Sequence, residues 1–237
     1  MLILGIESAS LTASAALLQD DTVIAEYTTN FKKTHSQTIL PMIDEILRMT
    51  EKDCGMLDAV AVSEGPGSFT GLRIGASLAK GLAFPGDLPI IPVPTLDAIA
   101  YGAFGSDAVL CPLMDARRME VYSGLYGFNG EKFVVYEKAA ARPMKEQLER
   151  AEALAKELGK PVMYLGDGLP VFEAEIRKNR TVPTLFAPAH TRCQRAGSVA
   201  ALGAKLFEEG VHASSLSFEP VYLRKSQAEQ ERERKGL

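Results

Sequence analysis

The sequence predicts an α/β fold in which two units each combine a mixed sheet with packed helices. Two observations lead to this prediction. In the first third of the chain, short runs of apolar and β-branched residues alternate with segments of helical periodicity. The same order, strands first and helices afterwards, recurs in the second half. With 237 residues, 46% of them hydrophobic and 24% charged, the chain is long enough for two lobes that each bury a core.

The first unit is expected to span residues 1–104. Asp20 and Asp21 mark a hairpin turn, and apolar residues at helical spacing predict helices over 36–49 and 72–84. The expected strands are 2–7, 13–18, 22–28, 58–63 and 89–93. A strand meander followed by helix, strand, helix and strand gives a mixed sheet with helices packed on it.

The second unit is expected to be a smaller lobe over residues 105–223. An amphipathic helix is predicted over 144–158, ended by Gly159, and another helix over 198–207. The expected strands are 108–115, 120–128, 132–138 and 162–165. The remaining residues, 224–237, are nearly all charged or polar and are expected to form a flexible tail.

Composition and spacing argue against several classes of protein. The net charge of −4 provides no whole-molecule field that attracts nucleic acid, so any basic patch must be local. No apolar run is long enough to cross a bilayer, and the N-terminus is typical of a strand rather than a signal peptide, which predicts a cytoplasmic protein. The three cysteines are far apart and are expected to be reduced and mostly buried. The three histidines lack HxxxH or HExxH spacing, so no metal site is predicted.

The stretch from Gly65 to Gly75, GPGSFTGLRIG, is the sharpest local signal. A glycine-rich loop between a strand and a helix exposes backbone N–H groups at the helix N-terminus, which suits an anion. The loop lacks the Gly-Lys-Ser/Thr ending of a Walker A motif. The alternative is a plain strand-to-helix turn with a serine or threonine N-cap. The candidate anion or nucleotide loop comprises Gly65, Gly67, Ser68, Thr70 and Arg73.

The two predicted helices of the first unit carry more apolar surface than one contact with a sheet requires. Apolar residues of 36–49 cover roughly 160° of the helix, whereas an ordinary surface helix needs a stripe of about 100°. In 72–84, small residues recur every four positions and form a ridge that allows close approach. Packing between sheet and neighbouring helix is the alternative. We predict a partner-docking face formed by Ile39, Met42, Ile43, Ile46, Leu72, Gly75, Ala76, Ala79 and Ala83.

Three further segments with charged residues have two interpretations each. Glu7, at the end of the first strand, is either an acid in a phosphate loop or a turn residue. Asp115 and Arg117 form either a salt-bridged turn or part of a ligand site. The sequence Gly-Asp-Gly at 166–168 either approaches a nucleotide or makes a tight turn. No residue is assigned a catalytic role.

Taken together, these segments resemble the TsaB (YeaZ) family. The resemblance covers almost the whole chain except the tail, and the stretch from Gly65 to Gly75 is its specific part. Supporting matches are LGIESA at 4–9, HSQTILP at 35–41, MDAR with EVY within 114–122, and PVYLR at 220–224.

The resemblance implies an actin-like ATPase (ASKHA, ribonuclease H-like) fold and a role in forming N6-threonylcarbamoyladenosine at position 37 of ANN-decoding tRNAs. It implies a non-catalytic subunit that pairs with a TsaD-like catalytic subunit, with a TsaE-like ATPase joining the complex. tRNA would be reached through the complex, and a homodimer could form when the partner is absent. No tightly bound cofactor is expected, and ATP with magnesium would bind only within the complex.

The same relatedness implies the loss of a metal site. The catalytic relative carries histidines in an HxxxH pattern just after a strand that ends in Ile-Pro-Val. Here 91–93 reads Ile-Pro-Val, so the histidine positions fall on Thr95 and Ile99. Neither supplies an imidazole, and Asp97 alone cannot hold a catalytic metal.

Two alternatives to a docking subunit remain. An autonomous ATP-dependent transferase or kinase would need metal carboxylates, for which Glu7 and Asp115 are the only candidates. A peptidase is disfavoured, because the sequence offers no HExxH motif, no paired histidines and no identifiable Ser-His-Asp set.

Overall fold

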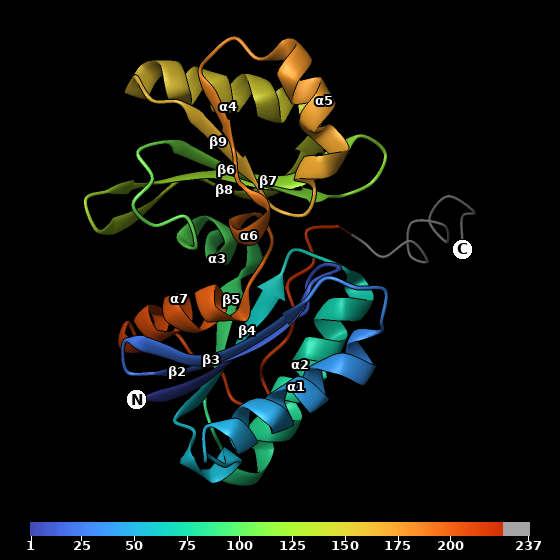
Figure 1. Ribbon diagram of the computed structural model, residues 1–237, viewed down its shortest axis with the longest axis vertical. Helices are drawn as coiled ribbons and strands as arrows, with labels where there is room; N and C mark the ends of the chain where they lie inside the picture. Colours follow the sequence, from blue (N-terminus) through green and yellow to red (C-terminus); the bar gives the residue numbers. More distant parts are fainter. Residues whose placement is uncertain (225–237) are drawn as a thin grey trace.

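Two mixed sheets form the framework of the protein, one in each of two lobes stacked along its long axis (Figure 1). The structure is a computed structural model, and it describes residues 1–224. The predicted tail therefore lies outside the described residues, apart from Arg224. Within the described part, every helix is too short or too polar to cross a bilayer.

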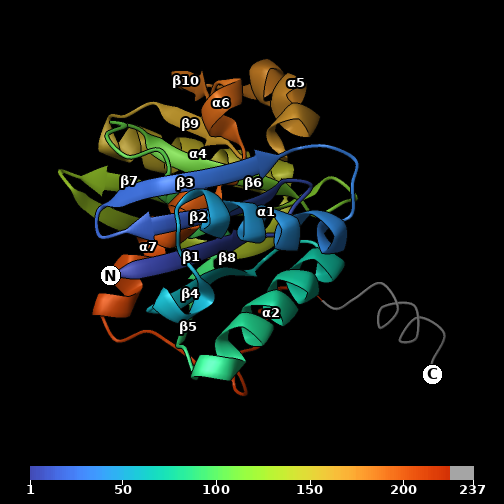
Figure 2. The same ribbon diagram turned by 60° about the horizontal axis from the view of Figure 1, so that its bottom comes forward.

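The first sheet has the strand order β3-β2-β1-β4-β5. Its strands are β1 (Leu2–Glu7), β2 (Ala13–Gln19), β3 (Thr22–Thr29), β4 (Ala59–Gly65) and β5 (Ile90–Pro94). The β1–β2 and β2–β3 pairs are antiparallel, whereas β4 and β5 add in parallel beside β1. This arrangement confirms the predicted meander followed by parallel strands, and Figure 2 shows the five strands side by side.

The second sheet repeats this topology, with the order β8-β7-β6-β9-β10 when it is read from the meander. Its strands are β6 (Val109–Asp115), β7 (Glu120–Asn129), β8 (Lys132–Pro143), β9 (Val162–Leu165) and β10 (Thr184–Phe186). Again the first three strands are antiparallel and the last two are parallel. The duplication predicted from the order of elements is therefore confirmed.

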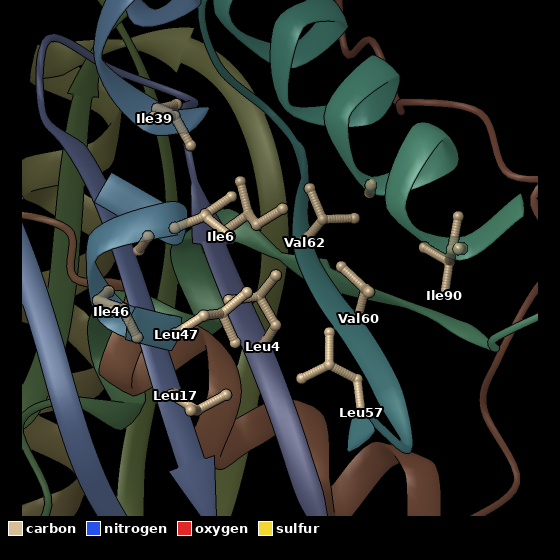
Figure 3. Packing of buried hydrophobic residues seen from close by; sticks show 14 of the residues in the cluster. Leu4, Ile6, Leu17, Ile39, Ile46, Leu47, Leu57, Val60, Val62 and Ile90 are labelled. Atoms are coloured by element: carbon tan, nitrogen blue, oxygen red, sulfur yellow. The ribbon is translucent and has the colours of Figure 1, made fainter. Parts of the chain in front are cut away.

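Helices cover both faces of the first sheet. α1 (His35–Met49) and α2 (Phe69–Ala83) lie on one face, and α7 (Ala196–Glu208) lies on the other (Figures 1 and 2). Figure 3 shows Ile39, Ile46 and Leu47 of α1 directed toward strand residues such as Leu4 and Ile6. Burial of each such side chain contributes roughly 1.5–3 kcal/mol, so this contact fixes α1 on the sheet.

In the second lobe, α4 (Met144–Leu158) and α5 (Leu169–Asn179) cover one face of the sheet. α4 begins and ends where the sequence predicted, and Gly159 follows it with a left-handed φ of 65°. The short helix α3 (Thr95–Tyr101) lies on the opposite face, between the two sheets. Its apolar side chains pack with residues of both lobes, so the lobes share one buried cluster.

The predicted extent of the second lobe was wrong at its C-terminal end. After α6 (Ala189–Arg192), the chain returns to the first lobe, where α7 packs on β1, β2, β4 and β5. Ala213 then exchanges two backbone hydrogen bonds with Ile90, and Phe218 enters the first core. The physical reason is that the first sheet has two apolar faces, and α1 with α2 covers only one.

Sequence patterns missed α3, α5, α6 and β10. These elements are short or begin at prolines, and their periodicity is correspondingly weak. All three cysteines are free, but only Cys111 is buried, so the prediction of mostly buried thiols was wrong.

Candidate functional site

A cleft of ≈ 820 Å³ lies between the lobes. The first lobe contributes the turn after β1, with Ser10 and Leu11, and the loop at 66–70. The second lobe contributes the β6–β7 turn at 114–118 and Asp167. The last described residues complete the wall. We call residues 219–224 the C-terminal strap, and its Tyr222, Leu223 and Arg224 line the cleft.

The glycine-rich loop packs against the chain's own backbone. A Cβ atom on Gly67 would lie 2.4 Å from the carbonyl oxygen of Ala9, and the Ser68 N–H donates to that oxygen at 2.7 Å. Ser68 is the N-cap of α2, and its Oγ accepts a hydrogen bond from Gly71 N at 3.3 Å. The alternative of a strand-to-helix turn thus has direct structural support, whereas the anion-binding role stays a prediction.

The five predicted loop residues do not share one surface. Gly67, Ser68 and Thr70 line the interlobe cleft, but Gly65 is buried beneath the strap. Arg73 points to the outer side of α2, where its guanidinium lies 3.9 Å from the centre of the Phe69 ring. Arg73 is therefore no part of the cleft wall.

Glu7 is fully buried behind the cleft. Its Oε1 accepts from Ala9 N at 2.6 Å, and its Oε2 accepts a short hydrogen bond from the Ser63 hydroxyl. Burial raises the pKa of Glu7 from 4.5 to about 7, although both hydrogen bonds oppose the shift. Both carboxylate oxygens are engaged by the protein, which favours the structural interpretation of Glu7 over a role in a phosphate loop.

The two other charged candidates lie at the cleft itself. Asp115 accepts from Arg117 N at 2.8 Å and pairs with its guanidinium at 3.2 Å, which confirms a salt-bridged turn. Asp167 accepts from Gln194 Nε2 at 2.9 Å, and burial raises the pKa of this carboxyl. The backbone of Arg117, Arg118 and Met119 is left-handed at three successive residues, with φ values of 67°, 56° and 60°. The sequence did not reveal this strain.

The positions where a catalytic relative would carry metal ligands belong to the core. Thr95 is 0% and Ile99 5% exposed, and Ile99 lies in the cluster shared by both lobes. The Asp97 carboxylate accepts from the Tyr126 hydroxyl at 2.9 Å. Within residues 1–224, no group of three or more His, Cys, Asp or Glu side chains gathers to hold a metal.

A second hollow, an apolar groove of ≈ 560 Å³, lies between α1 and α2. Leu40 from α1 and Ile74 and Leu78 from α2 supply its aliphatic surface, and Leu40 is 49% exposed. Phe69 and Thr70 line both this groove and the interlobe cleft. We call this hollow the helix groove. Ser36, Arg73 and Ser77 complete its lining.

The predicted docking residues were wrong as surface positions, although their helices border the helix groove. Met42 is half-buried against the core, and the other eight are buried: Ile39, Ile43, Ile46, Leu72, Gly75, Ala76, Ala79 and Ala83. The ridge of small residues serves a contact inside the lobe, because a Cβ on Gly75 would lie 2.2 Å from Ser8 Oγ. The predicted docking residues form the sides of α1 and α2 that face the sheet. Other apolar residues of the two helices, Leu40 and Ile74, line the helix groove and were not among the predicted residues.

Comparison with known proteins places the chain in a family. The family model described as "TsaD: tRNA N6-adenosine threonylcarbamoyltransferase" matches residues 22–232. The chain is 36% identical over 236 residues to the tRNA threonylcarbamoyladenosine biosynthesis protein TsaB of Bacillus subtilis, covering 97% of this chain and 96% of the relative. The chain belongs to the TsaB family. The TsaB of Escherichia coli is 32% identical over 96% of both chains.

The structural comparison gives the fold of this TsaB-family chain. The solved structure of YeaZ from Pseudomonas aeruginosa superposes with a TM-score of 0.76 at 22% identity, covering 94% of this chain and 99% of that one. The fold is the actin-like ATPase fold, with a mixed sheet in each lobe and the cleft between them.

Proposed function

We propose that the chain is a non-catalytic, partner-binding subunit that acts in the cytoplasm to form N6-threonylcarbamoyladenosine at position 37 of ANN-decoding tRNAs. It would act with a TsaD-like catalytic subunit and a TsaE-like ATPase, and it would reach tRNA through their complex. The observation that carries the proposal is the helix groove, an exposed apolar surface in a chain whose relatives bear the TsaB name.

The chemistry of the groove supports a protein partner. Its exposed lining is mainly apolar, from Leu40, Phe69, Ile74 and Leu78, and polar residues complete it: Ser36, Thr70, Arg73 and Ser77. A mixture of apolar surface and polar groups is typical of protein interfaces. An amphipathic helix of a partner would fit between α1 and α2 as a third helix. Without a partner, a second copy of the chain could cover the same groove, which would give a homodimer.

Three features weigh against an autonomous enzyme. The side chains of Thr95 and Ile99 supply no imidazole and are buried. Glu7 is engaged by Ser63 and the backbone, and Asp115 is engaged by Arg117. We therefore expect ATP and magnesium to bind only within the complex.

The test is reconstitution. The chain is co-expressed with its TsaD-like partner, the mixture is resolved by size-exclusion chromatography, and tRNA modification is assayed with and without the chain. We expect a heterodimer and modification that requires the chain, together with no modification by the chain alone. Modification by the isolated chain, or full modification in its absence, would reject the proposal.

A further inference from the structure

Three arginines line the interlobe cleft, and a fourth, outside the cleft wall, lies beside it. Arg117 and Arg118 project from the β6–β7 turn, and Arg224 projects from the C-terminal strap. Arg73 adjoins the same mouth, because its Nε donates to the Tyr222 hydroxyl at 3.4 Å and Tyr222 lines the cleft. The four side chains come from three segments that are distant in sequence.

Two lysines extend this surface along the first lobe. Lys32 and Lys33 are exposed in the loop between β3 and α1. The His35 ring at the end of this loop donates through Nε2 to the carbonyl oxygen of Ser10 at 2.6 Å, and Ser10 lines the cleft. We call the six side chains the cationic rim: Lys32, Lys33, Arg73, Arg117, Arg118 and Arg224.

Most of the cationic rim carries uncompensated charge. Arg117 pairs with Asp115, and Arg224 pairs with Glu120 at 2.8 Å. Among residues 1–224, no carboxylate lies within ion-pair distance of the remaining four: Lys32, Lys33, Arg73 and Arg118. In a chain with a net charge of −4, these four side chains are cations without a paired carboxylate.

The turn that carries two of these arginines is held in an unfavourable backbone conformation. Left-handed backbone is unfavourable for a residue with a Cβ, and Arg117, Arg118 and Met119 adopt it in succession. Strain of this kind tends to persist at functional sites. Here it displays two exposed guanidinium groups at the cleft.

Aromatic rings lie among the cations. Phe31, in the loop that carries the two lysines, is 69% exposed, and Tyr222 packs on Phe69 in a tilted arrangement with ring centres 4.7 Å apart. Exposed rings beside arginines and lysines are the combination on which unpaired bases stack while phosphates are neutralised.

We propose that the cationic rim is an RNA-contacting surface, on which the backbone phosphates of a folded RNA lie across the mouth of the interlobe cleft. The inference rests on the proposed function for the identity of the RNA, a tRNA. The cations extend over both lobes, a wider arrangement than one mononucleotide needs, and the exposed rings favour RNA over an acidic protein segment.

The test measures RNA binding by fluorescence anisotropy across a salt series, with the full chain and a labelled, unmodified transcript of an ANN-decoding tRNA. The rim variant is K32Q/K33Q/R118Q, which spares Arg73 because it also lines the helix groove. The control variant, K132Q/K156Q/K178Q, removes the same number of charges from exposed positions of the second lobe. Circular dichroism checks that both variants are folded.

We expect the unaltered chain to bind with a Kd on the order of 10–100 µM at low salt. The rim variant should bind about 10-fold more weakly, and the slope of log K against log salt should flatten by roughly 0.7–0.9 for each lost phosphate contact. The control variant should behave as the unaltered chain does. Equal weakening by both variants, or no binding by the unaltered chain, would overturn the proposal. So would tighter binding of a polyglutamate peptide than of the tRNA at the rim.

A second measurement separates this inference from the docking function. The rim variant should still form the heterodimer with the TsaD-like partner, and L40E in the helix groove should still bind RNA. If L40E loses the heterodimer and still binds RNA, the loss bears on the proposed docking function and leaves the RNA-contacting surface unaffected. Loss of RNA binding in both variants would contradict a separate RNA surface.

Discussion

The carbonyl oxygen of Val221 lies 2.2 Å from the point that a Cβ atom on Gly65 would occupy. The Val221 N–H also donates to the carbonyl oxygen of Glu64 at 2.7 Å, so the C-terminal strap runs directly over the glycine-rich loop. Gly65 has a φ of 126°, a conformation that only glycine adopts readily. Gly65, the first glycine of the glycine-rich stretch, thus accommodates the chain's own C-terminal strap.

The first prediction concerns that contact. We expect G65A to lower the free energy of unfolding by about 3 kcal/mol, because the new methyl group adds a backbone clash to the strain of a positive φ. G105A is the matched control, since Gly105 also has a positive φ, 82°. Within residues 1–224, no heavy atom other than those of Gly105 and its chain neighbours lies within 4 Å of the position that the new methyl group would take. G105A should cost only about 1 kcal/mol. Urea denaturation measures both, and equal losses would show that the strap contact contributes nothing.

The second prediction concerns the helix groove. L40E and I74E should each abolish co-purification with the TsaD-like partner without changing the melting temperature by more than a few degrees. A glutamate would place a charge in an apolar interface while remaining hydrated in the free chain. L216E is the control, because Leu216 is 82% exposed and lies outside the groove. Retained co-purification with L40E and I74E would exclude this groove as the docking site.

A buried alanine distinguishes surface from core on the same helix. Ala79 is 0% exposed, so we expect A79E to unfold the first lobe rather than to remove one interface. Circular dichroism would report this as a loss of helical signal. A folded A79E protein that merely fails to bind its partner would support the docking role that the sequence predicts for Ala79.

The third prediction concerns pH. Burial raises the pKa of Glu7 to about 7 in the folded chain, against an ordinary value of 4.5, so the folded state binds more protons between these values. The contribution of Glu7 to stability is therefore fully present below about pH 4.5 and is lost as pH rises through 7, by about 3 kcal/mol. E7Q keeps the shape of the side chain without the charge. It should have a higher melting temperature than the unaltered chain at pH 8 and lack this advantage at pH 4.5. A difference that is the same at both pH values would contradict the assignment.

The fourth prediction concerns the two buried tyrosines. Y126F removes the hydroxyl that donates to Asp97, and we expect it to cost about 1.5–3 kcal/mol, as for a hydrogen bond to a charged group. It should also raise the pKa of Asp97 further, because burial raises that pKa and the tyrosine opposes the rise. Y164F is the control, since the buried Tyr164 hydroxyl has no hydrogen-bond partner among residues 1–224. In chemical denaturation, Y164F should leave the free energy of unfolding unchanged or raise it. A larger loss of stability in Y164F than in Y126F would contradict the prediction.

Most of the helices and strands could be predicted from local sequence signals. α4 has an apolar stripe and a glycine after its last turn, and its bounds agree with the prediction. The strands of both meanders were found because β-branched and apolar runs end at turn residues. α3 was missed because seven residues are too few for a helical period to stand out. The run of left-handed residues at Arg117 to Met119 left no signal, because none of them is a glycine or asparagine.

The site was harder to predict, because a side chain's exposure depends on what packs against it. The sequence correctly indicated surplus apolar surface on α1, but it could not show that Ile39, Ile43 and Ile46 face the sheet and Leu40 faces the groove. It placed Arg73 in the glycine-rich loop, whereas Arg73 lies one turn into α2, with its guanidinium over the Phe69 ring, and lines the helix groove. In such errors the residues are assigned to the wrong face of a helix. The sequence fixes the angle between successive side chains around the helix axis, but it does not fix which face packs against the sheet.

By itself, the sequence determined the alternation of strands and helices, the duplicated order of elements and the family resemblance, because these depend on neighbouring residues and their periodicity. Only the tertiary structure decided that α7 and the C-terminal strap return to the first lobe, that Gly65 accommodates Val221, and that Arg117, Arg118 and Arg224 from separate segments line one cleft. Contacts between distant segments depend on which apolar faces find each other during packing, and no local pattern records that outcome.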